Sequence, residues 1–234
     1  MSRIILIETS TSLCSTALSE DGKIVSYKES VEPRAHASLT AVFVQEMLAE
    51  RGLRVKDCDA VCLSMGPGSY TGLRVGSSTA KGLCFGGDIP LIAVSTTEVL
   101  AYQAIEAGLP KGCRTIIPLI DARRMEVYSA LYSPSGEQLT EIKPLVVEAG
   151  SFDAPLAEGP VAFIGDGASK CETLLQEKGV GFGSSTFTQC CPKACSMLKP
   201  ALREFSEGRF RDTAYFEPFY LKDFVATVSR KNVF

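Results

Sequence analysis

Two short loops of this sequence carry the side chains that could do chemistry. One is residues 66–76, Gly-Pro-Gly-Ser-Tyr-Thr-Gly-Leu-Arg-Val-Gly, and the other is residues 8–12, Glu-Thr-Ser-Thr-Ser. Each follows an apolar run that predicts a buried strand, so each lies where a strand ends. Glycine allows positive φ, and the first turn of a helix has free N–H groups, so the first loop suits an anion or a closely packed neighbour.

The glycine loop is a strand-to-helix elbow without a nucleotide motif. Gly66 and Gly68 supply the freedom to turn, Pro67 fixes its own φ, and Ser69 or Thr71 is suited to cap the helix that follows. A P-loop requires Lys and then Ser or Thr directly after its last glycine, whereas Leu-Arg follows here. The dinucleotide pattern Gly-x-Gly-x-x-Gly is absent as well.

Small residues continue into that helix at every fourth position. Gly72, Gly76 and Ala80 fall about one helical turn apart and therefore share one face. Another backbone can approach such a stripe closely. The stripe either packs inside the domain or receives a helix of another protein, and the sequence leaves both open.

Few residues could serve as catalytic groups. His36 is the single histidine, so a Ser-His-Asp arrangement would need it, with Ser69 as the one suitable nucleophile. A kinase would need a carboxylate base, for which Asp121 and Asp166 are the candidates. Cys190, Cys191 and Cys195 cluster, but no histidine lies near them and their spacing fits no zinc module. We therefore predict no metal and no cofactor.

Composition limits the classes of protein. The 234 residues carry a net charge of −3, which argues against nucleic-acid binding through the chain's own basic surface. Met1-Ser2-Arg3 leads directly into a strand rather than into a signal peptide. No apolar run reaches about 18 residues, so no membrane span is predicted. Nine cysteines without a signal peptide indicate reduced thiols and a cytoplasmic protein.

The pattern of elements predicts two lobes of similar build. Periodicity and turn signals predict strands at 4–9, 14–19, 23–29, 60–64, 90–94, 115–120, 125–132 and 161–165, and helices at 35–51, after 72, after 95, after 167 and at 193–207. A strand meander followed by α/β units thus occurs twice. We place the N-terminal lobe at 1–107 and the C-terminal lobe at 108–234, with the helix at 193–207 able to pack back on the first lobe.

The helix at 35–51 has two apolar faces. Ala37, Ala41, Val44 and Leu48 form one, and Leu39, Val42, Phe43 and Met47 form the other. A helix on the outside of a domain needs only one apolar face. The second face therefore predicts a partner surface, unless the helix is sandwiched inside a thick domain.

Two lobes that each begin with a meander resemble the actin, sugar-kinase and heat-shock ATPase superfamily, an α/β fold built on ribonuclease-H-like sheets. Its members hold phosphates with two hairpin loops. The first hairpin here is Glu8, Thr9, Ser10 and Thr11, which has Glu in place of the usual Asp and no glycine. The second, residues 121–124, also lacks glycine. We expect the fold to be kept and the ATP site to be degraded.

Four segments give a closer resemblance, to the TsaB (YeaZ) family, and together they cover essentially the whole chain. They are residues 7–11, 66–76, 120–128 and 217–221. The resemblance implies a non-catalytic scaffold that pairs with TsaD, is joined by the ATPase TsaE, and serves formation of threonylcarbamoyladenosine beside the anticodon of tRNAs that read codons starting with A. It also implies a homodimer when TsaD is absent.

The resemblance assigns the partner interface to the two helices described above. The residues concerned are Leu39, Val42, Phe43, Met47, Gly72, Gly76 and Ala80. TsaD holds its metal with paired histidines in its first helix, whereas the matching helix here has only His36. A glycoprotease-like hydrolase and a small-molecule kinase of the same fold remain the alternatives.

Overall fold

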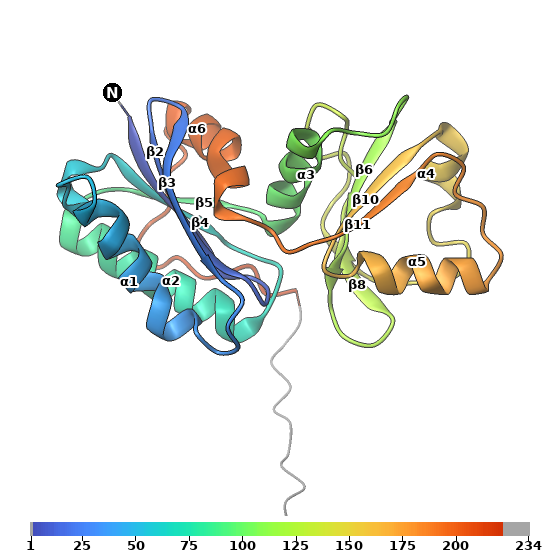
Figure 1. Cartoon of the computed structure of the whole chain (residues 1–234), viewed down its shortest axis with the longest axis horizontal. Helices are drawn as coiled ribbons and strands as arrows, with labels where there is room; N and C mark the ends of the chain where they lie inside the picture. The colour runs from blue at the N-terminus through green and yellow to red at the C-terminus, as the bar shows by residue number, and fades with distance from the viewer. Residues whose placement is uncertain (1, 222–234) are drawn as a thin grey trace, which may run out of the picture.

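The first thirty residues form the predicted meander in the computed structural model, which describes residues 2–221. Strands β1 (Arg3–Glu8), β2 (Cys14–Glu20) and β3 (Lys23–Ser30) pair antiparallel. Strands β4 (Ala60–Ser64) and β5 (Leu91–Val94) add in parallel on the other side of β1, in the order β3-β2-β1-β4-β5. This sheet forms the left-hand lobe in Figure 1.

Helices cover both faces of this sheet, which is why β1 is continuously apolar from Ile4 to Ile7 rather than alternating. Ile5 and Ile7 point to the face covered by α1 (His36–Ala49) and α2 (Tyr70–Gly87). Ile4 and Leu6 point to the opposite face and pack on η2 (Ala194–Met197) and α6 (Leu198–Ser206). A short 3-10 turn, η1 (Val55–Asp57), precedes β4.

The elbow begins its helix earlier than the periodic pattern alone indicated. Helix α2 starts at Tyr70, because Ser69 is its N-cap and its Oγ accepts a hydrogen bond from Gly72 N at 3.4 Å. Helix α3 (Thr96–Ala107) begins at the predicted cap, since Ser95 Oγ accepts from Glu98 N at 3.2 Å. The glycine elbow and the start of α3 thus both lie at the ends of parallel strands.

The second lobe is built around two small sheets. Strands β6 (Thr115–Pro118), β10 (Val161–Gly165) and β11 (Thr186–Gln189) are parallel, in the order β11-β10-β6. Strands β7 (Ile120–Asp121), β8 (Glu126–Ser129) and β9 (Lys143–Val146) form an antiparallel meander. The remaining helices are α4 (Asp153–Glu158) and α5 (Ala168–Glu177). Figure 1 shows this lobe on the right, with α3 beside it.

The chain returns to the first sheet after the second lobe. The predicted helix at 193–207 forms as η2 and then α6, and Ala194, Met197 and Ala201 join the cluster around Ile4 and Leu6. Helix α3 contributes Val99 to that same cluster and Leu100 to a cluster in the second lobe. The division of the chain at residues 107 and 108 stays a prediction.

The last described segment crosses the edge of the first sheet. Arg211 N donates to Leu91 O at 2.8 Å, and Phe219 N donates to Met65 O at 2.7 Å. Between these points Lys81 Nζ donates to the carbonyl oxygens of Ala214 and Phe216, both at 3.0 Å. We refer to residues 211–221 as the C-terminal strap. Across residues 2–221, no helix is long and apolar enough to cross a membrane.

Candidate functional site

The elbow lies directly against the first hairpin. Ser69 N donates to Ser10 O at 2.6 Å, and Thr9 Oγ1 donates to Gly72 O at 2.9 Å. All four hairpin residues named in the sequence analysis are buried. The main-chain groups at the start of α2 therefore fill the space beside this hairpin. A phosphate-binding loop would have to leave that space free for its ligand.

The small-residue stripe is the reason that α2 can approach so closely. A β-carbon on Gly68 would lie 2.3 Å from Ser10 O, and one on Gly76 would lie 2.3 Å from Thr9 Oγ1. Gly72, Gly76 and Ala80 are all buried. The expectation that this stripe receives a partner helix is therefore corrected, because its neighbours are the hairpin and Leu63 of this same chain.

Glu8 is a fully buried carboxyl at the base of the hairpin. Its Oε1 accepts from Ser10 N at 2.6 Å, and burial raises its pKa to about 7. Three buried side-chain oxygens have no hydrogen-bond partner among the described residues, and they are Glu8 Oε2, Ser10 Oγ and Thr11 Oγ1. The hairpin thus retains polar atoms, and the described part of the chain shields them from solvent.

The second hairpin is held closed by a lysine that the sequence reasoning missed. Lys170 Nζ binds Asp121 Oδ1 at 2.6 Å and donates to the carbonyl oxygens of Arg124 at 2.9 Å and Glu126 at 2.7 Å. Asp166 Oδ1 accepts from Asp121 N at 2.8 Å, and burial raises the pKa of Asp166. Both candidate kinase carboxylates are therefore engaged in holding the turn.

The candidate hydrolase residues are not joined. Ser69 Oγ caps α2, whereas His36 Nε2 lies 3.0 Å from Thr11 O, and no hydrogen bond connects the two side chains in the described part of the chain. Cys190 Sγ accepts from Gln103 Nε2 at 3.2 Å. Within residues 2–221, no three His, Cys, Asp or Glu side chains gather as metal ligands would.

The outer face of α1 is smaller than the sequence predicted. Met47 is fully buried and packs with Val44 and Leu48 against the sheet, so its assignment to the partner face is wrong. Val42 is 40% exposed, and Leu39 and Phe43 are half-buried beside it. These three residues are called the α1 patch below.

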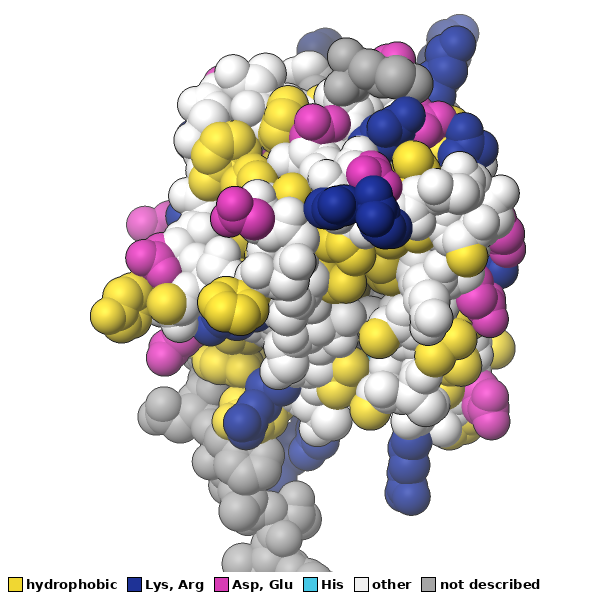
Figure 2. Space-filling model, turned by 90° about the vertical axis from the view of Figure 1, so that its left-hand side faces the viewer, with side chains coloured by type: hydrophobic (Ala, Val, Ile, Leu, Met, Phe, Trp, Pro, Cys, Tyr) yellow, Lys and Arg dark blue, Asp and Glu magenta, His cyan; other side chains and the backbone are white. Residues whose placement is uncertain are grey.

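The end of α2 adds an exposed aromatic residue that the periodic pattern did not single out. Phe85 is 90% exposed, although most phenylalanines lie in cores. Figure 2 looks at the end of the molecule where α1 and α2 end, and shows hydrophobic side chains standing at the surface between charged ones. A single exposed apolar side chain is common on protein surfaces, whereas several together are typical of a surface that binds another protein, so Phe85 counts here only in combination with the α1 patch.

Fold and site together define a protein of the actin-like ATPase class in which both phosphate hairpins are closed by the protein's own residues. Residues 27–229 match the family model described as "TsaD: tRNA N6-adenosine threonylcarbamoyltransferase". The chain belongs to the TsaB (YeaZ) family, within the broader family that this model describes.

The relatives that support this assignment cover about three quarters or more of the chain. The tRNA threonylcarbamoyladenosine biosynthesis protein TsaB of Escherichia coli is 32% identical, over 96% of each chain. TsaB of Bacillus subtilis is also 32% identical, over 74% of this chain and 75% of its own. The solved structure of YeaZ from Pseudomonas aeruginosa superposes with a TM-score of 0.77 and 27% identity, covering 94% of this chain and all of that one.

Proposed function

We propose that this protein is the non-catalytic partner of TsaD in the complex that forms N6-threonylcarbamoyladenosine beside the anticodon of tRNAs reading codons that start with A. The names of its relatives support a place in this pathway. TsaE joins the complex as its ATPase, and tRNA is bound through the complex rather than by this chain alone. The net charge of −3 agrees with tRNA being bound mainly by other proteins of the complex.

The closed hairpins are the observation that carries the non-catalytic assignment. Phosphoryl chemistry in this fold class needs backbone groups that reach a nucleotide phosphate. Here the start of α2 packs on residues 8–12, and Lys170 fills the second turn with three contacts. No observation favours the hydrolase alternative, because Ser69 and His36 serve different local structures.

The α1 patch and the exposed end of α2 form the surface that we assign to TsaD. The match of this chain to a TsaD family model supports a partner of related fold, which could present similar helices. Leu39, Val42 and Phe43 supply apolar area on α1, and Phe85 supplies an aromatic anchor on α2. The same surface would join two copies of this chain when TsaD is absent.

Co-purification with TsaD of the same organism tests the proposal, followed by a tRNA modification assay with and without this chain. We expect a stable complex, and modification that depends on both proteins. The isolated chain should show no peptidase, kinase or transferase turnover. Robust turnover by the pure protein, abolished by Ser69→Ala or Asp121→Ala, would overturn the scaffold assignment.

A further inference from the structure

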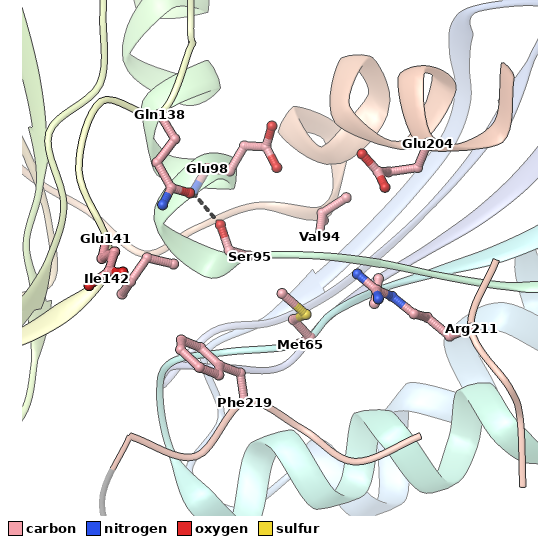
Figure 3. Close-up of a pocket in the computed structure, with 11 residues that line it drawn as sticks. Met65, Val94, Ser95, Glu98, Gln138, Glu141, Ile142, Glu204, Arg211 and Phe219 are labelled. Carbon is pink, nitrogen blue, oxygen red and sulfur yellow. Dashed lines mark hydrogen bonds between the residues drawn. The ribbon is translucent and has the colours of Figure 1, made fainter. Parts of the chain in front are cut away.

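A cavity of about 530 Å³ lies between the two lobes, away from both hairpins. Its walls come from the ends of β4 and β5, the start of α3, the loop at 138–142, α6 and the C-terminal strap, and Figure 3 shows the side chains around it. None of residues 8–12 or 121–124 lines it. The cavity is therefore separate from the places where this fold class holds phosphates.

The edge of β5 faces this cavity. The carbonyl oxygens of Pro90 and Val94 point toward β4, because they accept hydrogen bonds from Val61 N and Met65 N. The carbonyl oxygen of Leu91 points the other way and accepts from Arg211 N. Successive residues of a strand direct their N–H and C=O groups to opposite sides. Ala93, two residues after Leu91, therefore also directs these groups away from β4. Ala93 lines the cavity, and the strap turns aside after Arg211.

Among residues 2–221, the charged side chains that line the cavity include one cation without an acidic partner. Glu98 pairs with Arg203 at 2.8 Å, and Glu204 pairs with Arg203 at 3.0 Å and Arg209 at 2.6 Å. The side chain of Arg211 lines the cavity and has no acidic partner among residues 2–221. Figure 3 shows it beside Met65. Glu141 also lines the cavity, and it pairs with Lys143 at 3.5 Å. Because each of these three carboxylates has a cationic partner, the guanidinium of Arg211 is the charged group left for a ligand, and it favours an anionic one.

We propose that this cavity binds a carboxylate with a neighbouring secondary amide, as at the C-terminus of an extended peptide or in a free N-acyl amino acid. The carboxylate pairs with the guanidinium of Arg211, and the amide pairs with the free edge of β5 at Ala93. Ala93 lies two residues beyond Leu91, about 7 Å along the strand, which an arginine side chain can span. Met65, Ile142 and Phe219 offer apolar walls for the ligand's side chain.

The site is independent of any pairing with TsaD, and its test uses the protein alone. The probes are acetyl-trialanine with a free C-terminus, its C-terminal amide, and N-acetyl-L-alanine, each titrated into the ¹⁵N-labelled protein. We expect saturable shifts of the Ala93 amide and the Arg211 Nε signals, with the free acid binding at least fivefold more tightly than the amide. Tighter binding of acetyl-trialanine than of N-acetyl-L-alanine assigns the site to chain termini, and equal binding assigns it to acyl amino acids.

Three variants separate the two contacts. Arg211→Gln should abolish the preference for the free acid, whereas Lys199→Gln, which removes an exposed charge of α6 outside the cavity lining, should not. Ala93→Pro replaces the outward N–H by a ring carbon at an edge-strand position whose N–H does not point toward β4, and should weaken binding of all three probes. The proposal fails if acid and amide bind equally to the wild type, or if Arg211→Gln retains the preference.

Discussion

A β-carbon on Gly72 would stand 2.0 Å from the carbonyl oxygen of Thr9. No other residue type fits there without moving the backbone of one partner, so helix α2 and the first hairpin form a single unit. The contact also explains why a glycine occupies the first turn of a helix, where it costs helix propensity.

Gly72→Ala should destabilise the protein by more than about 2 kcal/mol, because the added methyl group meets backbone atoms that cannot rotate away. Gly82→Ala is the matched control on the same helix. A β-carbon there meets nothing within 4 Å, so this change should be neutral or stabilising by up to about 1 kcal/mol. Urea unfolding of both variants measures the difference, and equal stabilities would contradict the packing described.

Val42→Glu should leave the protein folded and weaken its complex with TsaD at least a hundredfold. A charge in the proposed interface is desolvated without a partner, whereas Val42 is 40% exposed in the free chain. Leu139→Glu, at an exposed apolar residue of the second lobe, is the control. Titration calorimetry gives both affinities. If Val42→Glu binds TsaD as tightly as the wild type does, the interface does not include the α1 patch.

Glu8 should make stability depend on pH. Its pKa of about 7 exceeds its ordinary value of 4.5, so folding favours the protonated form. The stabilising contribution is full below about pH 4.5 and is lost as the pH rises through 7, by about 3 kcal/mol in total. Glu8→Gln keeps an acceptor for Ser10 N and does not titrate. The free energy of unfolding of Glu8→Gln, relative to the wild type, should rise between pH 4.5 and 8. Parallel curves of stability against pH would show that burial does not raise the pKa of Glu8.

Lys170→Met should loosen the second hairpin. The change removes three contacts of the ammonium group and frees a turn in which Arg123 and Arg124 have φ of 69° and 49°. Such left-handed residues persist only where their surroundings hold them. Amide exchange over 121–126 should accelerate more than tenfold, with about 1–2 kcal/mol lost in stability. Lys178→Met, at an exposed lysine after α5, should change neither quantity.

Much of the fold follows from local pattern. Apolar runs bounded by turn residues predicted β4 and β10, and the cap at Ser95 predicted the start of α3. These predictions succeed because strand burial and capping are decided within a few residues. The degraded ATP site, expected because both hairpins lack glycine, stays a prediction.

The site geometry depended on contacts that sequence does not reveal. Helix α1 is apolar on several sides, so periodicity could not decide that Met47 faces the sheet and Val42 faces solvent. The small-residue stripe of α2 was compatible with two neighbours, and only the fold identifies the hairpin as the one it meets. Lys170 lies 49 positions from Asp121, and nothing local marks their pairing.

The chain returns to its first sheet after the second lobe, so the second lobe can complete its core before the first during synthesis. Ala194 N donates to Ser15 Oγ across 179 positions, and the cluster on that face of the sheet needs Met197 and Ala201. The strands of the second lobe lie between Thr115 and Gln189, and the residues that pack on them extend no further than Cys190. The half of the protein that leaves the ribosome first therefore completes its core last, and until then one apolar face of β1 and β2 stays uncovered.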